Sequence, residues 1–138
     1  MFVRGAQASS MRTLFLVALG SALGGAARFL LAGWVGARLG ESFPWGTVLV
    51  NVLGSALIGA LAAQEEMLSP EARQFLMVGV LGGFTTFSAF AADAVLLADQ
   101  GAGATSAAYV VATLAGGLLA LWGGTSLGRS LRRRRPVT

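Results

Sequence analysis

Polar side chains recur at regular spacing inside stretches of the chain that are otherwise apolar. Thr47, Asn51 and Ser55 follow one another every four residues, so a helix would place them on one face. The asparagine amide supplies two N–H donors that an anion can use. A second stripe with the same spacing consists of Thr105, Tyr109 and Thr113. Such stripes are either hydrogen-bonding contacts between helices or the walls of a polar path, and two of them in so small a protein favour the path.

The segment 79–90, with the sequence GVLGGFTTFSAF, is the most unusual of the chain. Gly82 and Gly83 are followed, after Phe84, by the β-branched Thr85 and Thr86, and this composition disfavours a continuous helix. A break in a helix at membrane depth is tolerated only where protein or a cavity satisfies the freed backbone groups. Carbonyl oxygens freed in this way can coordinate a cation.

Phe87 and Phe90 lie three residues apart, so on a helix they share a face, with Asp93 one turn further. They could be ordinary packing residues. An aromatic ring also carries a negative face and a positive edge. Ring edges that face a pore could therefore stabilise a small, partly dehydrated anion without any fixed positive charge.

The composition identifies the environment in which these residues must be held. Of the 138 residues, 55% are apolar and only 12% are charged, with a mean hydropathy of +0.72. Soluble chains carry about a quarter charged residues, so the chain belongs to the membrane class. Histidine and cysteine are both absent, which excludes zinc sites of the usual kind, thiol nucleophiles and imidazole acid–base chemistry. No base or nucleophile accompanies Asp93, and we do not expect an enzyme.

Four apolar runs, at about residues 13–35, 45–63, 74–97 and 105–127, each approach the roughly 20 residues that cross a membrane as a helix. We therefore predict an all-α membrane protein with four transmembrane helices, the third broken at mid-membrane. A polar extension at 1–11 precedes the four-helix transmembrane domain at 12–128, and a basic tail follows at 129–138. Translation could start at Met1 or at Met11.

Small residues recur four apart in these runs, which lets helix backbones approach closely in lipid. The pairs are Gly20/Gly24, Ser55/Gly59, Gly79/Gly83 and Gly124/Gly128.

All ten basic residues are arginines, and four spans place both termini and the linker 64–73 on one side of the membrane. That side holds eight arginines and the opposite loops hold Arg38 alone, so the positive-inside rule predicts cytoplasmic termini. Anionic lipid headgroups fit these flanking arginines better than nucleic acid does. Arg28, inside the first span, either reaches back to the interface or attracts anions in a water-filled vestibule.

Three segments, in order along the first three spans, resemble the Fluc family of fluoride channels, also called CrcB. They are GGAARF at 24–29, GTVLVNVLGS at 46–55 and GGFTTFSAF at 82–90. The resemblance covers the chain apart from residues 1–11 and the arginine tail. It implies a multi-pass protein of the bacterial plasma (inner) membrane that exports fluoride passively as an antiparallel, dual-topology dimer with two fluoride pathways.

The resemblance also assigns site residues. It implies a structural sodium ion at the dimer centre, held by the backbone carbonyls of Gly82 and Thr85 from both subunits. Phe87 and Phe90 would line the fluoride path and Asn51 would donate a hydrogen bond. It further implies roles for Thr86 and Ser88 around the break, Tyr109 and Thr113 on the fourth-helix polar track, Arg28 near the aqueous entrance and Asp93 in gating. Ala89 and Asp93 depart from the family, where threonine and glutamate are usual.

The arginine bias leaves the partner open. The second subunit is either another copy of this chain or an oppositely biased paralogue. Two other functions compete with the channel for a membrane protein of four helices. A small multidrug antiporter needs a carboxylate in its first helix, where this chain has Arg28 and no acid. A membrane scaffold would explain the small-residue pairs but not the polar stripes.

Overall fold

The computed structural model describes residues 2–40 and 42–133, with side chains described from Ser10 onward, and every element in it is a helix. Four helical spans are long and apolar enough to cross a membrane: Ser10–Leu39, Trp45–Ala62, Pro70–Asp99 and Gly103–Arg133. The first, second and fourth correspond to α1 (Phe2–Leu39), α2 (Trp45–Ala62) and α6 (Gly103–Arg133). The prediction of an all-helical protein with four membrane-spanning helices is confirmed.

The third span is assembled from several elements. It runs through α3 (Pro70–Arg73), the π-helical segment η2 (Gln74–Leu81), α4 (Gly82–Phe84) and α5 (Phe87–Asp99). Between α4 and α5 the backbone is extended, with ψ of 157° at Thr85 and φ of −150° at Thr86. These two residues lie near the middle of the span.

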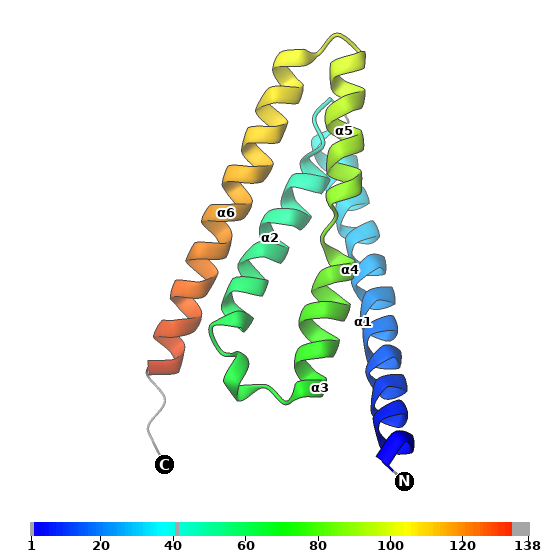
Figure 1. Ribbon diagram of the computed structural model, residues 1–138. Coiled ribbons are helices and arrows are strands. Elements are labelled where there is room, and N and C mark those ends of the chain that lie inside the picture. The colour runs from blue at the N-terminus through cyan, green and yellow to red at the C-terminus, as the bar shows by residue number, and fades with distance from the viewer. Residues whose placement is uncertain (1, 41, 134–138) are drawn as a thin grey trace.

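The helices pack as two pairs. α1 packs against η2 and α4, while α2 packs most extensively against α6 (Figure 1). Glycines lie where the backbones meet: a Cβ on Gly20 would fall 2.6 Å from the carbonyl oxygen of Phe75, and one on Gly128 would fall 2.6 Å from that of Ala60. The small-residue pairs in the sequence thus predicted close helix contacts correctly.

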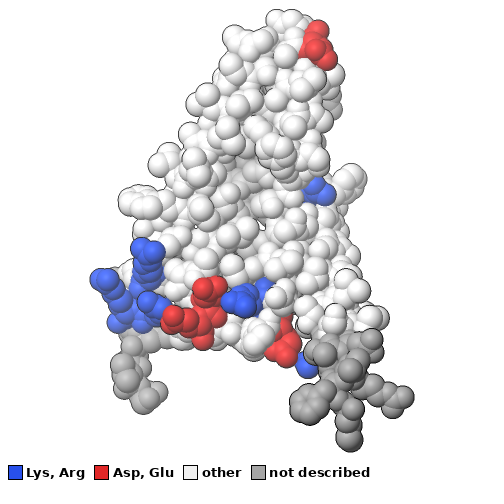
Figure 2. Space-filling model, in the orientation of Figure 1, with Lys and Arg blue, Asp and Glu red and all other residues white. Residues whose placement is uncertain are grey.

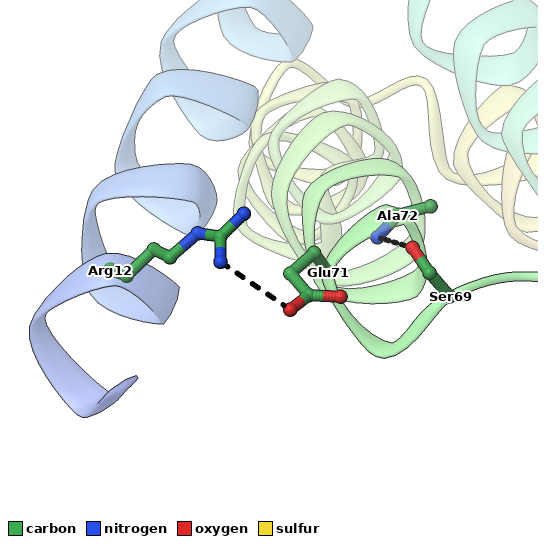
Figure 3. A network of polar contacts seen from close by, with 4 residues as sticks. All are labelled: Arg12, Ser69, Glu71 and Ala72. Carbon is green, nitrogen blue, oxygen red and sulfur yellow. Dashed lines mark hydrogen bonds and ion pairs between the residues drawn. The ribbon is translucent and has the colours of Figure 1, made fainter. Parts of the chain in front are cut away.

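Most of the described charged residues gather at the end of the bundle where α1 begins and α6 ends (Figures 1 and 2). There the short helix η1 (Glu65–Met67) and α3 connect the second and third spans. Ser69 caps α3 by accepting a hydrogen bond from the Ala72 N–H at 3.1 Å, and Arg12 of α1 pairs with Glu71 at 3.7 Å (Figure 3). The pair ties the first span to the start of the third, although an exposed ion pair contributes little stability.

The N-terminal extension expected at 1–11 is helical from Phe2 and continuous with the rest of α1. The first residues of the basic tail, 129–133, form the last turns of α6. Met1 and residues 134–138, with Arg134 and Arg135, lie outside the described residues.

Large apolar side chains cover much of the outer surface. Phe29, Leu118 and Trp122 are 78%, 69% and 72% exposed, whereas Val50 and Tyr109 are fully buried. A helix surface of this kind faces lipid or another membrane helix, since in lipid apolar exposure carries no penalty.

Candidate functional site

Asn51 of α2 holds the extended backbone between α4 and α5. Its Oδ1 accepts from the Thr86 N–H at 2.8 Å, and its Nδ2 donates to the Thr86 carbonyl at 3.0 Å. The two bonds satisfy both backbone groups of one residue, as a neighbouring strand would. One N–H of the Asn51 amide is left over.

The hydroxyls of the two threonines organise the same junction. The Thr86 Oγ1 caps α5 by accepting from the Ala89 N–H at 3.1 Å, and it lies 3.3 Å from the Ser88 Oγ. The Thr85 hydroxyl donates back to the Leu81 carbonyl at 3.0 Å, which closes the end of α4.

These bonds redirect two N–H donors away from backbone carbonyls. In an uninterrupted helix the Thr86 N–H would donate to the Gly82 carbonyl and the Ala89 N–H to that of Thr85. Here the first donates to Asn51 and the second to the Thr86 hydroxyl. The carbonyls of Gly82 and Thr85 have therefore lost the donors that a continuous helix would have given them.

A groove of about 340 Å³ opens beside this junction, between α2 and α6. Its polar lining comes from Asn51, Ser55, Thr85, Thr86 and Thr113, and its aromatic lining from Phe87 and Phe90. The remaining wall is aliphatic, with no arginine and no carboxylate among the lining residues. The groove therefore combines neutral polar groups and aromatic rings in apolar surroundings.

Thr113 contributes a hydroxyl with no partner. Its side chain is 6% exposed, and its Oγ1 is the one buried side-chain polar atom, within the described residues, that forms no hydrogen bond. A buried hydroxyl without a partner costs about 1–3 kcal/mol. Thr113 is also one of the residues that line the groove.

Aromatic rings connect the groove to the interior of the bundle. Phe87 is 77% exposed and its ring centre lies 5.6 Å from that of Phe90, which is buried. Phe90 packs against Tyr109 at 5.4 Å, and Tyr109 meets Phe43 edge-on at 5.7 Å. These four rings form a continuous series of contacts that begins at the groove with Phe87 and ends at Phe43, on the side of Tyr109 away from the groove.

On that far side, one carboxylate oxygen joins three spans. The Oδ2 of Asp93 accepts from the Thr47 hydroxyl at 2.8 Å and from the Tyr109 hydroxyl at 3.1 Å. Asp93 and Thr47 line a second cavity, of about 390 Å³, which also includes Phe43 and Gln100. Asp93 thus lies at a separate opening from Asn51, with Phe90 and Tyr109 between them.

The structure brings together most of the residues expected at the site. Asn51, Phe87, Phe90, Thr86 and Thr113 share the groove, and Ser88 and Tyr109 each contact a residue of this group. Two others lie elsewhere: Asp93 is at the second cavity, and Arg28 is a half-exposed residue of α1 that does not line the groove.

Two further contributors were missed at the sequence level. Thr47 belongs to the stripe on α2, but nothing in its spacing shows that it hydrogen-bonds Asp93. Phe43 precedes α2 in a loop, where no periodicity could place its ring against Tyr109.

Comparison with known proteins identifies the family. A family model described as "CrcB-like protein, Camphor Resistance (CrcB)" matches residues 15–125. The chain is 46% identical over 124 residues to the fluoride-specific ion channel FluC of Rhizobium meliloti (strain 1021), covering 88% of this chain and 99% of that protein. It is 47% identical over 124 residues to FluC of Agrobacterium fabrum (strain C58 / ATCC 33970), with the same coverage. With four spans and these relatives, it is a multi-pass membrane protein and belongs to the CrcB family.

Proposed function

We propose that this chain is the subunit of a fluoride-selective ion channel that lets fluoride leave the cytoplasm passively across the bacterial inner membrane. The family and the relatives named as fluoride-specific channels support the substrate. The observation that carries the mechanism is the groove in which the unpartnered Thr113 hydroxyl and the Asn51 amide lie beside Phe87 and Phe90.

The chemistry of the groove suits a small anion that has lost part of its water. Asn51 and Thr113 supply N–H and O–H donors, and the two phenylalanines supply positive ring edges. Since no arginine lines the groove, an ion entering it meets no fixed charge that would hold it too tightly to leave. Conduction requires binding of this moderate strength.

The driving force is the membrane potential. Neutral hydrogen fluoride enters a cell from acid surroundings and dissociates at cytoplasmic pH, which traps the anion inside. A negative interior then expels fluoride through an open path, and each 100 mV contributes about 2.3 kcal/mol per charge. The chain needs no energy source of its own for this export and acts as a channel, not as an enzyme.

Gly82 and Thr85 fit the sodium ion that the family resemblance implies. Their carbonyls have lost their helical donors to Asn51 and to the Thr86 hydroxyl. Neutral carbonyl oxygens suit a hard monovalent cation, and no group of three or more histidine, cysteine or acidic residues in the described chain offers a rival metal site. When bound, the ion would compensate the dipoles of these carbonyls. It would also link the interrupted third spans of the two subunits.

Two carbonyls are too few to surround a cation, so a second subunit in the opposite orientation completes the site in this proposal. The 77% exposure of Phe87 supports such a partner, because a ring that lines a narrow path needs protein on its open side. The partner is a second copy or an oppositely biased paralogue. An oppositely biased paralogue would balance the uneven distribution of the described arginines, which place Arg38 at one end and, at the other, Arg12, Arg73, Arg129, Arg132 and Arg133.

The test is fluoride efflux from liposomes that contain this chain alone, with potassium and valinomycin setting the voltage and chloride measured in parallel. Voltage-driven fluoride loss with little chloride loss is the expected result for a homodimer. No efflux until an oppositely biased paralogue is added would identify the heterodimer. Equal loss of both anions, or no flux with either partner, would refute the fluoride channel.

A further inference from the structure

The last turns of α6 extend beyond the hydrocarbon core. The helix has 31 residues, which at a rise of about 1.5 Å per residue gives roughly 46 Å. A bilayer core is only about 30 Å thick. Arg129 and Arg133, near the end of the helix, therefore lie at the depth of the lipid headgroups on the side of the chain termini.

The arginines at this end have two different environments. Arg132 turns toward the protein and pairs with Glu66 at 3.2 Å. Arg129 and Arg133, four residues apart and on another face, are exposed and form no ion pair with any carboxylate in the described part of the chain. Figure 2 shows the basic residues gathered over the end of α6.

The two unpaired arginines border a hollow of about 380 Å³ whose lining is completed by Ser126 and Ser130. The Ser126 hydroxyl donates to the Trp122 carbonyl at 2.9 Å, so its remaining capacity is to accept a hydrogen bond. The hollow thus combines two guanidinium groups, which match phosphate in shape and charge, with a hydroxyl that can accept from a ligand O–H.

The surface next to the hollow shows what kind of phosphate compound fits. Trp122 lies one turn before Ser126 on the same face and is 72% exposed, and the exposed Leu118 and Leu119 follow deeper along the helix. Tryptophan is enriched at membrane interfaces. A ligand that contacts both the hollow and this apolar surface would have a phosphate head and apolar chains.

We propose that the face of α6 formed by Trp122, Ser126, Arg129, Ser130 and Arg133 binds an anionic phospholipid in the leaflet on the side of the chain termini. The arginines hold the lipid phosphate, Ser126 accepts from a headgroup hydroxyl, and an acyl chain lies along Trp122. Phosphatidylglycerol, with its free glycerol hydroxyls, is the matching probe.

The test uses Trp122 as a reporter in the full-length chain. Trp34 and Trp45 are replaced by phenylalanine, and the protein is reconstituted with brominated phosphatidylglycerol or brominated phosphatidylcholine at equal mole fraction. Bromine quenches tryptophan fluorescence on contact. We expect stronger quenching by phosphatidylglycerol, with a local enrichment on the order of fivefold per arginine. The double variant Arg129→Gln/Arg133→Gln should remove this preference.

Arg132→Gln is the matched control for the single variants Arg129→Gln and Arg133→Gln, because each removes one positive charge from the same end of α6 but Arg132 is paired with Glu66. Arg132→Gln should retain most of the preference. Equal quenching by both lipids in the parent protein, or an equal loss in Arg132→Gln and the two single variants, would overturn the proposal. Loss of the preference on adding inorganic phosphate, but not chloride at matched ionic strength, would show a site for free phosphate and would also overturn it.

Discussion

Asn51 and Thr86 are joined by two reciprocal hydrogen bonds, although 35 residues separate them in the chain. The bonds consume the N–H that would otherwise pair with the Gly82 carbonyl, so the same side chain stabilises the extended backbone and frees a carbonyl. One amide N–H of Asn51 still has no assigned partner. A single residue can thus fix the break in the third span and present a donor to the groove.

Replacing Asn51 should affect both roles. Asn51→Leu leaves the Thr86 N–H and carbonyl unpaired and should lower the free energy of unfolding by about 1–3 kcal/mol, with loss of fluoride efflux. Asn51→Asp keeps an acceptor for the Thr86 N–H but sets an unpaired carboxylate oxygen against the Thr86 carbonyl, so it should abolish efflux and cost at least as much stability as Asn51→Leu. Unfolding is measured by detergent titration in mixed micelles, and efflux in liposomes.

Ser55→Ala is the control for Asn51. The Ser55 hydroxyl donates to the Asn51 carbonyl at 2.7 Å within α2, so its loss breaks no contact with the third span. The variant should be close to the parent in stability. If Asn51→Leu were equally stable, the reciprocal bonds to Thr86 could not be holding the break.

The sequence predicted the spans and the grouping of the site better than the individual contacts. Apolar length and the four-residue spacing of Asn51 and Ser55 depend on local periodicity, which a helix preserves. The contact between Thr47 and Asp93 depends on how two spans are rotated about their axes, and that rotation is set by packing over the whole bundle. The spacing of Phe87, Phe90 and Asp93 along the third span likewise could not show that Asp93 lines a different cavity from Asn51.

Thr113→Val should move stability and flux in opposite directions. Valine has nearly the same shape but removes a buried hydroxyl that has no partner in this chain, so the free energy of unfolding should rise by about 1 kcal/mol. If the hydroxyl serves the passing anion, efflux should fall nonetheless, and Thr113→Ser should restore it. Thr125→Val is the control, because the Thr125 hydroxyl already donates to the Leu121 carbonyl at 2.8 Å. Unchanged efflux in Thr113→Val would exclude Thr113 from the path.

Thr47 and Tyr109 should be energetically coupled through Asp93. Both hydroxyls donate to the same carboxylate oxygen, so Thr47→Val and Tyr109→Phe should each cost about 1–3 kcal/mol. The double variant should deviate from their sum by roughly 0.5 kcal/mol or more. The comparison cycle pairs Thr47→Val with Ser106→Ala, whose hydroxyl donates to the Ala94 carbonyl at 2.7 Å and does not touch Asp93. Strict additivity in both cycles would contradict the shared carboxylate.

Gly123 and Gly124 provide a matched pair for the contact between α2 and α6. A Cβ on Gly124 would fall 2.9 Å from the Ala56 carbonyl carbon, whereas one on Gly123 would meet nothing within 4 Å. Gly124→Ala should therefore force the two helices apart and lower the free energy of unfolding by about 1–3 kcal/mol. Gly123→Ala should be neutral, or stabilising by up to about 1 kcal/mol, because alanine is the better helix former. Both are measured by detergent unfolding of the purified protein. The same shift in both variants would mean that helix propensity, and not the approach of the two backbones, explains why glycine is used here.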